Sequence, residues 1–173
     1  MRLVEQASEA RRNRDHRGAV GLAERAAEAA RESGDLDALG VSLAALGRLR
    51  RDEHDASAAV DFYEQSAAIA RQQRDDVALA HRLRHIGDIV AEEGDLERAE
   101  RCYEEAGKLF DRHDIGQLAR ANFLRSKALL REKQGSKAAA AELWSDARAL
   151  YADTGIEAGV EESDRRLEGL NSN

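Results

Sequence analysis

Residues 92–106 read EEGDLERAERCYEEA and contain the pattern that decides the fold. A Gly-Asp pair at positions 94–95 precedes Ala99, Tyr103 and Ala106, which are spaced by four and three positions. Residues at these spacings share one face of an α-helix, so the stripe predicts a helix that packs closely along this face. Glycine accepts the left-handed backbone at a helix C-terminus, and aspartate caps the free amides of a following helix. The pair therefore predicts a sharp corner between two helices.

The same arrangement occurs four times along the chain. The alanines aligned with Ala99 are separated by 40, 40 and 41 residues, and the last three copies place an aromatic residue four positions later. One such unit is two helices long, and a single helix pair buries too little surface alone, so successive pairs must stack and share a core. The first copy is the most degenerate. The aligned positions are Ala19, Ala59, Ala99 and Ala140; Ala23, Tyr63, Tyr103 and Trp144; and Ala26, Ser66, Ala106 and Ala147.

The repeated unit resembles the tetratricopeptide repeat (TPR), whose pattern is W-x2-L-G-x2-Y, then A-x3-F/Y-x2-A, then proline. Copies two and three match best, with LGRL…AAVDFYEQSA and IGDIV…DLERAERCYEEA, and copy four keeps AAELWSDA but lacks the Leu-Gly pair. No copy has the proline. The period exceeds the usual 34 residues by about six, which is similar to the kinesin light-chain type and to the TPR arrays of bacterial regulators. The resemblance implies an all-α, right-handed α-α superhelix of about four helix pairs with a C-terminal capping helix.

The repeat pattern also suggests the limits of the units. We expect a single TPR-like domain over residues 1–173, with a capping helix at about 156–170, where the pattern fails to restart. A solenoid needs a last helix with a polar outer face, which is the role expected of this segment. The alternative is that Leu167 and Leu170 dock onto a second copy of the chain. The expected repeats cover about residues 1–34, 35–75, 76–114 and 115–154.

Composition independently favours helices. Charged residues make up 35% of the 173 residues, aromatic residues only 4%, and proline is absent, which is typical of long amphipathic helices rather than strands. The formal net charge of −7 argues against a general nucleic-acid binder, because such proteins use a basic face. No apolar run approaches 18 residues, and the first residues lack a secretory signal. A single cysteine, Cys102, cannot form an internal disulfide, so we expect a cytoplasmic protein.

The sequence contains no recognisable enzyme motif: it lacks a glycine-rich phosphate loop, paired metal-binding cysteines and a G-x-S-x-G elbow. His81 and His85 stand one helical turn apart, and with Asp88 they offer a candidate metal site of the kind found on H-E-x-x-H helices. No glutamate separates the two histidines, which favours an ordinary groove surface. We therefore expect no enzyme activity, no metal and no other cofactor. A response of the two histidines to pH remains an open alternative.

The TPR resemblance implies where a ligand would bind. In TPR proteins the first helix of each pair lines the concave face, and the peptide ligand usually lies there. Arginine binds carboxylates through two parallel hydrogen bonds, so an acidic peptide or chain terminus is the expected ligand. The alternative is that these arginines are ordinary solvated surface. The residues expected to bind the peptide are Arg48, His81, Arg84, His85, Asn122 and Arg125.

The carboxylate clamp of co-chaperone TPR domains is absent. The corresponding positions hold Ala44, Arg48, His85, Asn122 and Ser126 instead of the Lys and Asn set of that clamp. We expect a non-catalytic protein–protein interaction module that binds a peptide or helix of a partner in its concave groove. Nucleic acids and membranes are not expected partners. The alternative function is a self-associating structural scaffold, a homodimer that uses its terminal helices.

Overall fold

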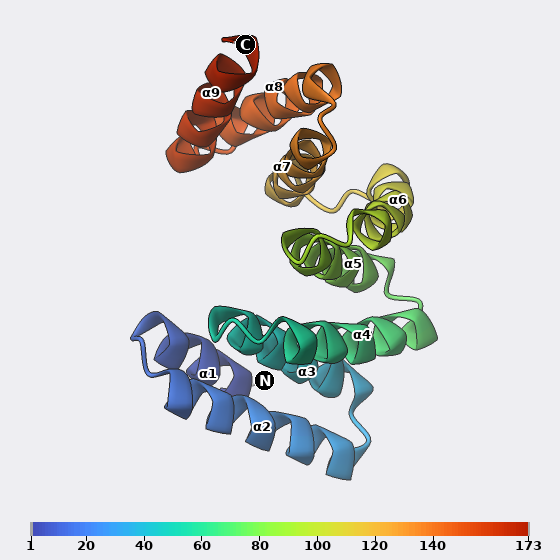
Figure 1. Ribbon diagram of the computed structural model, residues 1–173. Coiled ribbons are helices and arrows are strands. Elements are labelled where there is room, and N and C mark those ends of the chain that lie inside the picture. The colour runs from blue at the N-terminus through green and yellow to red at the C-terminus, as the bar shows by residue number, and fades with distance from the viewer. Residues whose placement is uncertain (1, 173) are drawn as a thin grey trace.

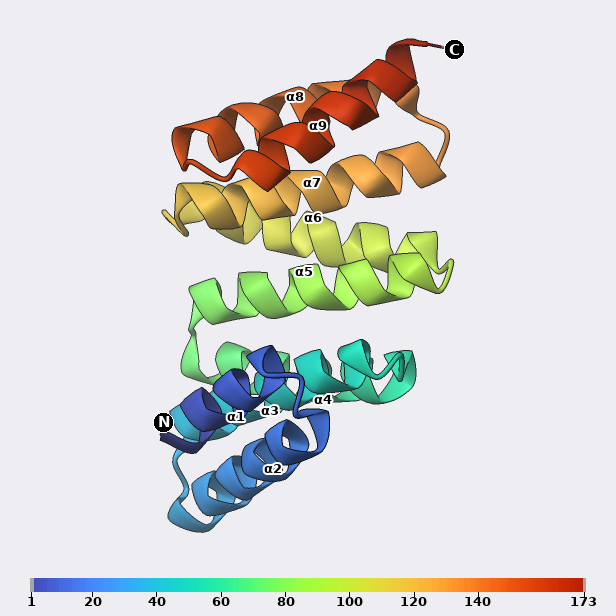
Figure 2. The ribbon, with the colours of Figure 1, turned by 90° about the vertical axis from the view of Figure 1, so that its left-hand side faces the viewer.

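The computed structural model describes residues 2–172, which form nine helices and no strand, as the sequence predicts (Figure 1). Consecutive helices pair as hairpins, and the pairs stack into a curved array with α5 and α7 on its inner side and α6 on its outer side (Figure 1). Seen from the open side of the curve, α5 and α7 cross in front of α6 (Figure 2). The helices are α1 (Arg2–Arg12), α2 (His16–Ser33), α3 (Leu36–Asp52), α4 (Ala56–Gln73), α5 (Asp76–Glu92), α6 (Leu96–Arg112), α7 (Gln117–Lys133), α8 (Lys137–Asp153) and α9 (Glu157–Asn171). Within residues 2–172, no helix combines the length and the apolar character that a membrane crossing needs.

Aspartate caps define most of the corners. Each of the helices α2 to α6 follows an aspartate whose side chain accepts a hydrogen bond from the backbone amide three residues later, at 2.9–3.0 Å. The predicted corner at positions 94–95 is confirmed, because Gly94 has a φ of 92° and Asp95 accepts from the amide of Arg98. These caps satisfy amides that no helical carbonyl reaches. The five capping residues are 20 positions apart: Asp15, Asp35, Asp55, Asp75 and Asp95.

The left-handed residue before each cap offers a test of backbone strain. His54 adopts a φ of 62°, whereas the equivalent corner before α3 uses Gly34 with a φ of 68°. Side chains disfavour this conformation, so His54→Gly is expected to raise the free energy of unfolding by about 0.5–1 kcal/mol, measured by urea denaturation. Gly34→Ala is the matched control and should lower it, since a Cβ at Gly34 would meet no atom within 4 Å and only the backbone is affected. A destabilised His54→Gly variant would contradict the argument.

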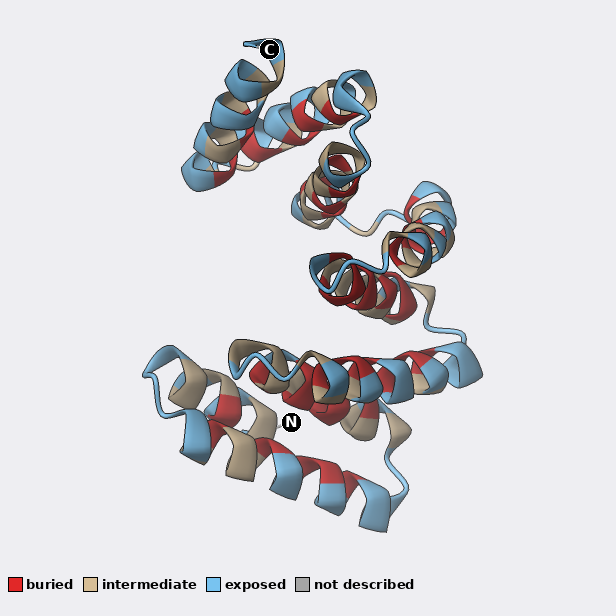
Figure 3. Ribbon diagram, in the orientation of Figure 1, coloured by how far each residue is buried: buried red, intermediate tan, exposed pale blue. Residues whose placement is uncertain are grey.

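The predicted stripe of small and aromatic residues is buried between the helices. The aligned alanines, including Ala99, are fully buried, and the side chains of Tyr63, Tyr103 and Trp144 are at most 2% exposed. Each tyrosine ring lies against a glycine of the preceding helix: a Cβ added at Gly87 would stand 2.5 Å from the ring of Tyr103. Buried positions follow the faces between successive helices (Figure 3). The small residues therefore serve close packing, as predicted.

Two features shape the C-terminal half. The link between α6 and α7 is extended at His113 and turns at Gly116, which has a φ of 87°. The Phe123 ring stacks on Phe110 with centroids 4.6 Å apart and contacts Tyr103 edge-on at 6.3 Å, so an aromatic cluster joins α7 to α6. At the end of the chain, α9 packs partly buried apolar side chains against the core. These side chains are Ile156 before the helix and Val160, Leu167 and Leu170 within it.

Candidate functional site on the concave face

The six residues predicted to bind a peptide lie on three inner helices. Arg48 belongs to α3, three of the residues to α5, and Asn122 and Arg125 to α7. Of the six, Arg84 and Arg125 line one cleft of about 200 Å³ between α5 and α7. The other four predicted residues do not line this cleft. Its lining includes Arg51, Arg84, Asp88, Arg125, Leu129 and Lys133.

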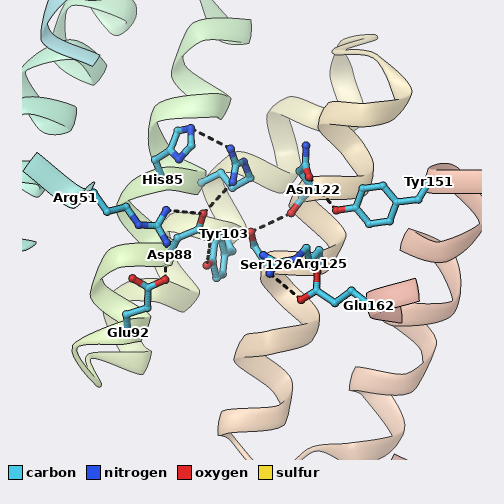
Figure 4. Close-up of polar contacts among 11 residues, drawn as sticks. Arg51, His85, Asp88, Glu92, Tyr103, Asn122, Arg125, Ser126, Tyr151 and Glu162 are labelled. Atoms are coloured by element: carbon cyan, nitrogen blue, oxygen red, sulfur yellow. Dashed lines mark hydrogen bonds and ion pairs between the residues drawn. The ribbon is translucent and has the colours of Figure 1, made fainter. Parts of the chain in front are cut away.

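Asp88 is the centre of the polar contacts in this cleft (Figure 4). One of its oxygens accepts a hydrogen bond from the Tyr103 hydroxyl at 2.7 Å, and the other forms an ion pair with Arg84 at 2.9 Å. Arg51 reaches across from α3, 3.7 Å from Asp88, and pairs with Glu92. Burial, together with the Asp88 carboxylate, raises the pKa of the Tyr103 hydroxyl, so this group stays a hydrogen-bond donor. The ion pair with Asp88, one turn further along α5, holds the Arg84 side chain in place.

The two predicted residues of α7 contact the end of the chain. Arg125 donates two hydrogen bonds, of 2.7 and 2.8 Å, to the carboxylate of Glu162 in α9 (Figure 4). This bidentate contact raises the pKa of Arg125. The Asn122 side-chain oxygen accepts a hydrogen bond from the Tyr151 hydroxyl at 2.9 Å. Both side chains thus help to hold α8 and α9 on α7.

The two histidines of α5 occupy different surroundings. His81 packs edge-on against Phe110, with ring centroids 6.3 Å apart. The ring of His85 stacks on Tyr63 at 5.0 Å, and its Nε2 lies 3.0 Å from a terminal nitrogen of Arg84. Burial, followed by the charges of nearby arginines, lowers the pKa of His85 to about 2, so the ring is neutral. Within residues 2–172, no group of three His, Cys, Asp or Glu side chains is placed to hold a metal ion.

The TPR resemblance also places five further residues of the cleft on first helices that face the groove, although they are not among the six predicted to bind the peptide. These residues are Arg51, Asp88, Glu92, Leu129 and Lys133. Lys133 donates from its ammonium to the backbone oxygen of Ala91 at 2.7 Å. The ion pair of Arg51 with Glu92 has an equivalent one repeat earlier, the ion pair of Arg11 with Asp52. Both pairs join residues 41 positions apart, so a search for opposite charges offset by one repeat would have found them.

The fold and this inner face define a TPR-like helical repeat protein. Among solved structures, the chain is similar to BtubC (BKLC) from P. vanneervenii, with 21% identity and a TM-score of 0.68 over 96% of this chain and 79% of that one. It is also similar to a protein from Podosopora anserina described as a kinesin light chain with nearly identical TPR-like repeats. That match has 14% identity and a TM-score of 0.66, over 98% of this chain and 93% of that one. No family model and no curated protein sequence matches the chain.

These similarities confirm the expected fold. Both solved structures align over nearly the whole chain, and the helices stack as in TPR-like solenoids. The predicted right-handed superhelix of helix pairs with a last capping helix is therefore correct. At these identities the similarity extends to the fold, and the function has to be argued from the site.

Proposed function

We propose that this chain is a non-catalytic protein–protein interaction module of the cytoplasm that holds an acidic peptide or helix of a partner on its concave face. In this proposal residues 1–173 act as one binding domain, with the repeats expected from the sequence. TPR-like folds generally serve as interaction scaffolds, and the inner helices present a continuous curved surface to a ligand.

One observation carries the choice of an acidic partner. The cleft between α5 and α7 is lined by four basic and two acidic side chains, although the whole chain has a net charge of −7. Its three arginines pair with Asp88, Glu92 and Glu162, so the positive charge left for a ligand is that of Lys133. A local positive charge on an acidic protein favours a segment of opposite charge. The partly buried Leu129 beside Lys133 adds an apolar contact for a peptide side chain.

Lys133→Glu tests this proposal. We expect the variant to bind acidic peptides about tenfold more weakly, because it reverses a charge that lines the cleft. A charge of this kind contributes on the order of 1 kcal/mol to the binding free energy. The probes are fluorescent peptides, blocked at both ends, of equal hydropathy and graded net charge, measured by fluorescence anisotropy. Lys108→Glu is the matched control, since it makes the same charge change at an exposed position of α6.

The control variant is expected to bind like the wild type, and circular dichroism should show equal helicity in all three proteins. Equal affinity of both variants for acidic peptides would contradict binding in this cleft. If the affinity of the wild type does not depend on peptide charge, and light scattering shows a stable dimer, the scaffold function is favoured instead.

A further inference from the structure

A glycine followed by a polar residue lies beneath a buried tyrosine in two successive repeats. In the later repeat, Tyr103 packs over Gly87 and donates to the carboxylate of Asp88 at 2.7 Å. In the earlier repeat, Tyr63 packs over Gly47, and the following residue is Arg48. A guanidinium has donors only, so it cannot supply the acceptor that Asp88 supplies. Tyr63 is 1% exposed, and its hydroxyl accordingly has no acceptor for its hydrogen.

Two further unpartnered atoms lie on the neighbouring helix. Within residues 2–172, the buried side-chain polar atoms without a partner are the Tyr63 hydroxyl, Nδ1 of His85 and Nε of Arg84. The rings of Tyr63 and His85 stack with centroids 5.0 Å apart, so these two side chains lie side by side. Because the guanidinium of Arg84 can only donate to Nε2 of His85, that nitrogen accepts and Nδ1 carries the hydrogen. Each of the three atoms can therefore donate a hydrogen bond.

The charge around these two side chains is positive. Arg48 is exposed and lies close to the Tyr63 hydroxyl and to the carboxylate of Asp52. Burial raises the pKa of Tyr63, and Arg48, by its charge and as a hydrogen-bond donor, opposes this rise together with the charges of Arg51 and Arg82. A guanidinium only donates, so the hydrogen of the Tyr63 hydroxyl still lacks an acceptor. Buried donors left unpaired cost free energy that an acceptor would recover. The carboxylate of Asp52 near Arg48 is bound by Arg11, so no residue of the described chain supplies an acceptor to the Tyr63 hydroxyl.

We infer that Arg48, Tyr63 and His85 form a binding site for one carboxylate group carried by the partner segment. The inference rests on the proposed function for the identity of the carrier, whereas the site itself follows from the unpaired donors. The ligand carboxylate takes the place beside Tyr63 that Asp88 takes beside Tyr103. A carboxylate offers two acceptor oxygens and one negative charge, which the planar fork of Arg48 can bind. Asp88 and Glu92 on the adjoining helix disfavour a dianion such as phosphate.

Sodium acetate is the probe of the site. Its titration at constant ionic strength, followed by NMR of the ¹⁵N-labelled His85 ring, is expected to shift the Nδ1 signal saturably in the wild type. Sodium chloride at the same ionic strength should not. Tyr63→Phe and Arg48→Asp are each expected to abolish the shift. The first removes a donor, and the second places a carboxylate of the chain where acetate would bind. A shift that persists in both variants, or that is absent from the wild type, overturns the inference.

The thermal midpoint separates a binding role from a structural one. Tyr63→Phe is expected to leave Tm unchanged, because the hydroxyl has no internal acceptor, whereas the matched change Tyr103→Phe should lower Tm by removing the bond to Asp88. Arg48→Asp is expected to raise Tm by giving Tyr63 the acceptor that Tyr103 already has. A loss of Tm in Tyr63→Phe equal to that in Tyr103→Phe means that the Tyr63 hydroxyl is satisfied internally, and overturns the inference.

Peptide binding separates this inference from the proposed function. Two sets of peptides are compared: amidated peptides with one glutamate, and peptides whose only carboxylate is a free C-terminus. The set whose affinity falls in Arg48→Asp identifies the source of the carboxylate. Acetate binding at His85 without any peptide binding supports the site and contradicts the proposed function. Peptides that bind wild type and Arg48→Asp equally leave the proposed function standing and overturn the site.

Discussion

Trp144→Ala is expected to lower the free energy of unfolding by about 3–5 kcal/mol. The Trp144 side chain is fully buried, and its indole donates to the Glu132 carboxylate at 2.5 Å. Leu167 and Leu170 of α9 pack against the cluster that it forms with alanines of α7 and α8. Truncation leaves a cavity and an unpaired acceptor beneath the last helix, and urea denaturation followed by circular dichroism measures the cost.

Leu118→Ala is the control for this prediction, since its side chain is 42% exposed and the change is expected to cost less than about 0.5 kcal/mol. Repeats contact only their neighbours, so the loss in Trp144→Ala should be regional. Hydrogen exchange is expected to accelerate more in α7 to α9 than in α1 to α4. Uniform acceleration along the chain, or a cost no greater than that of Leu118→Ala, would show that Trp144 does not anchor the C-terminal end.

The architecture was predictable because its signals are local and repeated. The stripe of Ala99, Tyr103 and Ala106 sets a helical spacing, and the corner at 94–95 ends one helix and caps the next. Each signal has a direct physical cause, close packing or amide capping, and recurs once per repeat. Repetition makes a set of individually weak residues decisive for the fold.

The charges of the candidate site were less predictable. Arg84 and Asp88 stand four residues apart on one helix, so their pair is visible in the sequence. The pair of Arg125 with Glu162 is not, because it depends on how far α9 folds back over α7. Nor does a side chain's residue type show whether it bonds to its own chain or to a ligand.

One informative contrast was nevertheless present in the repeat alignment. Arg48 and Asp88 occupy equivalent positions 40 residues apart, each following a glycine beneath a tyrosine. Only the structure shows that the tyrosine hydroxyl is paired in one repeat and unpaired in the other. The difference matters because a buried donor without an acceptor is destabilising, so its presence points to a ligand rather than to packing.

Acidification from pH 8 to pH 5 is expected to destabilise the fold by about 2 kcal/mol through His85 alone. Burial, followed by the charges of Arg84, Arg48, Arg51 and Arg82, lowers the pKa of His85 from 6.5 to about 2 in the folded chain. The unfolded chain therefore takes up a proton as the pH falls below 6.5, while the folded chain does not. The penalty is absent above that pH and grows steadily as the pH falls towards 2.

His85→Gln is expected to flatten this pH dependence, measured as the difference in unfolding free energy between pH 8 and pH 5. Some dependence should remain, because burial also lowers the pKa of His81 in the same direction. The ion-paired carboxylates of Asp52 and Glu100 have lowered pKa values as well, but their contribution is lost mainly below their ordinary values of 3.8 and 4.5. Ile86→Val, a buried change on the same helix without a titrating group, is the control and should destabilise equally at both pH values. A His85→Gln variant that keeps the full pH dependence of the wild type would show that His85 takes up its proton equally in the folded and the unfolded chain. That result would remove the neutral ring on which the carboxylate site depends.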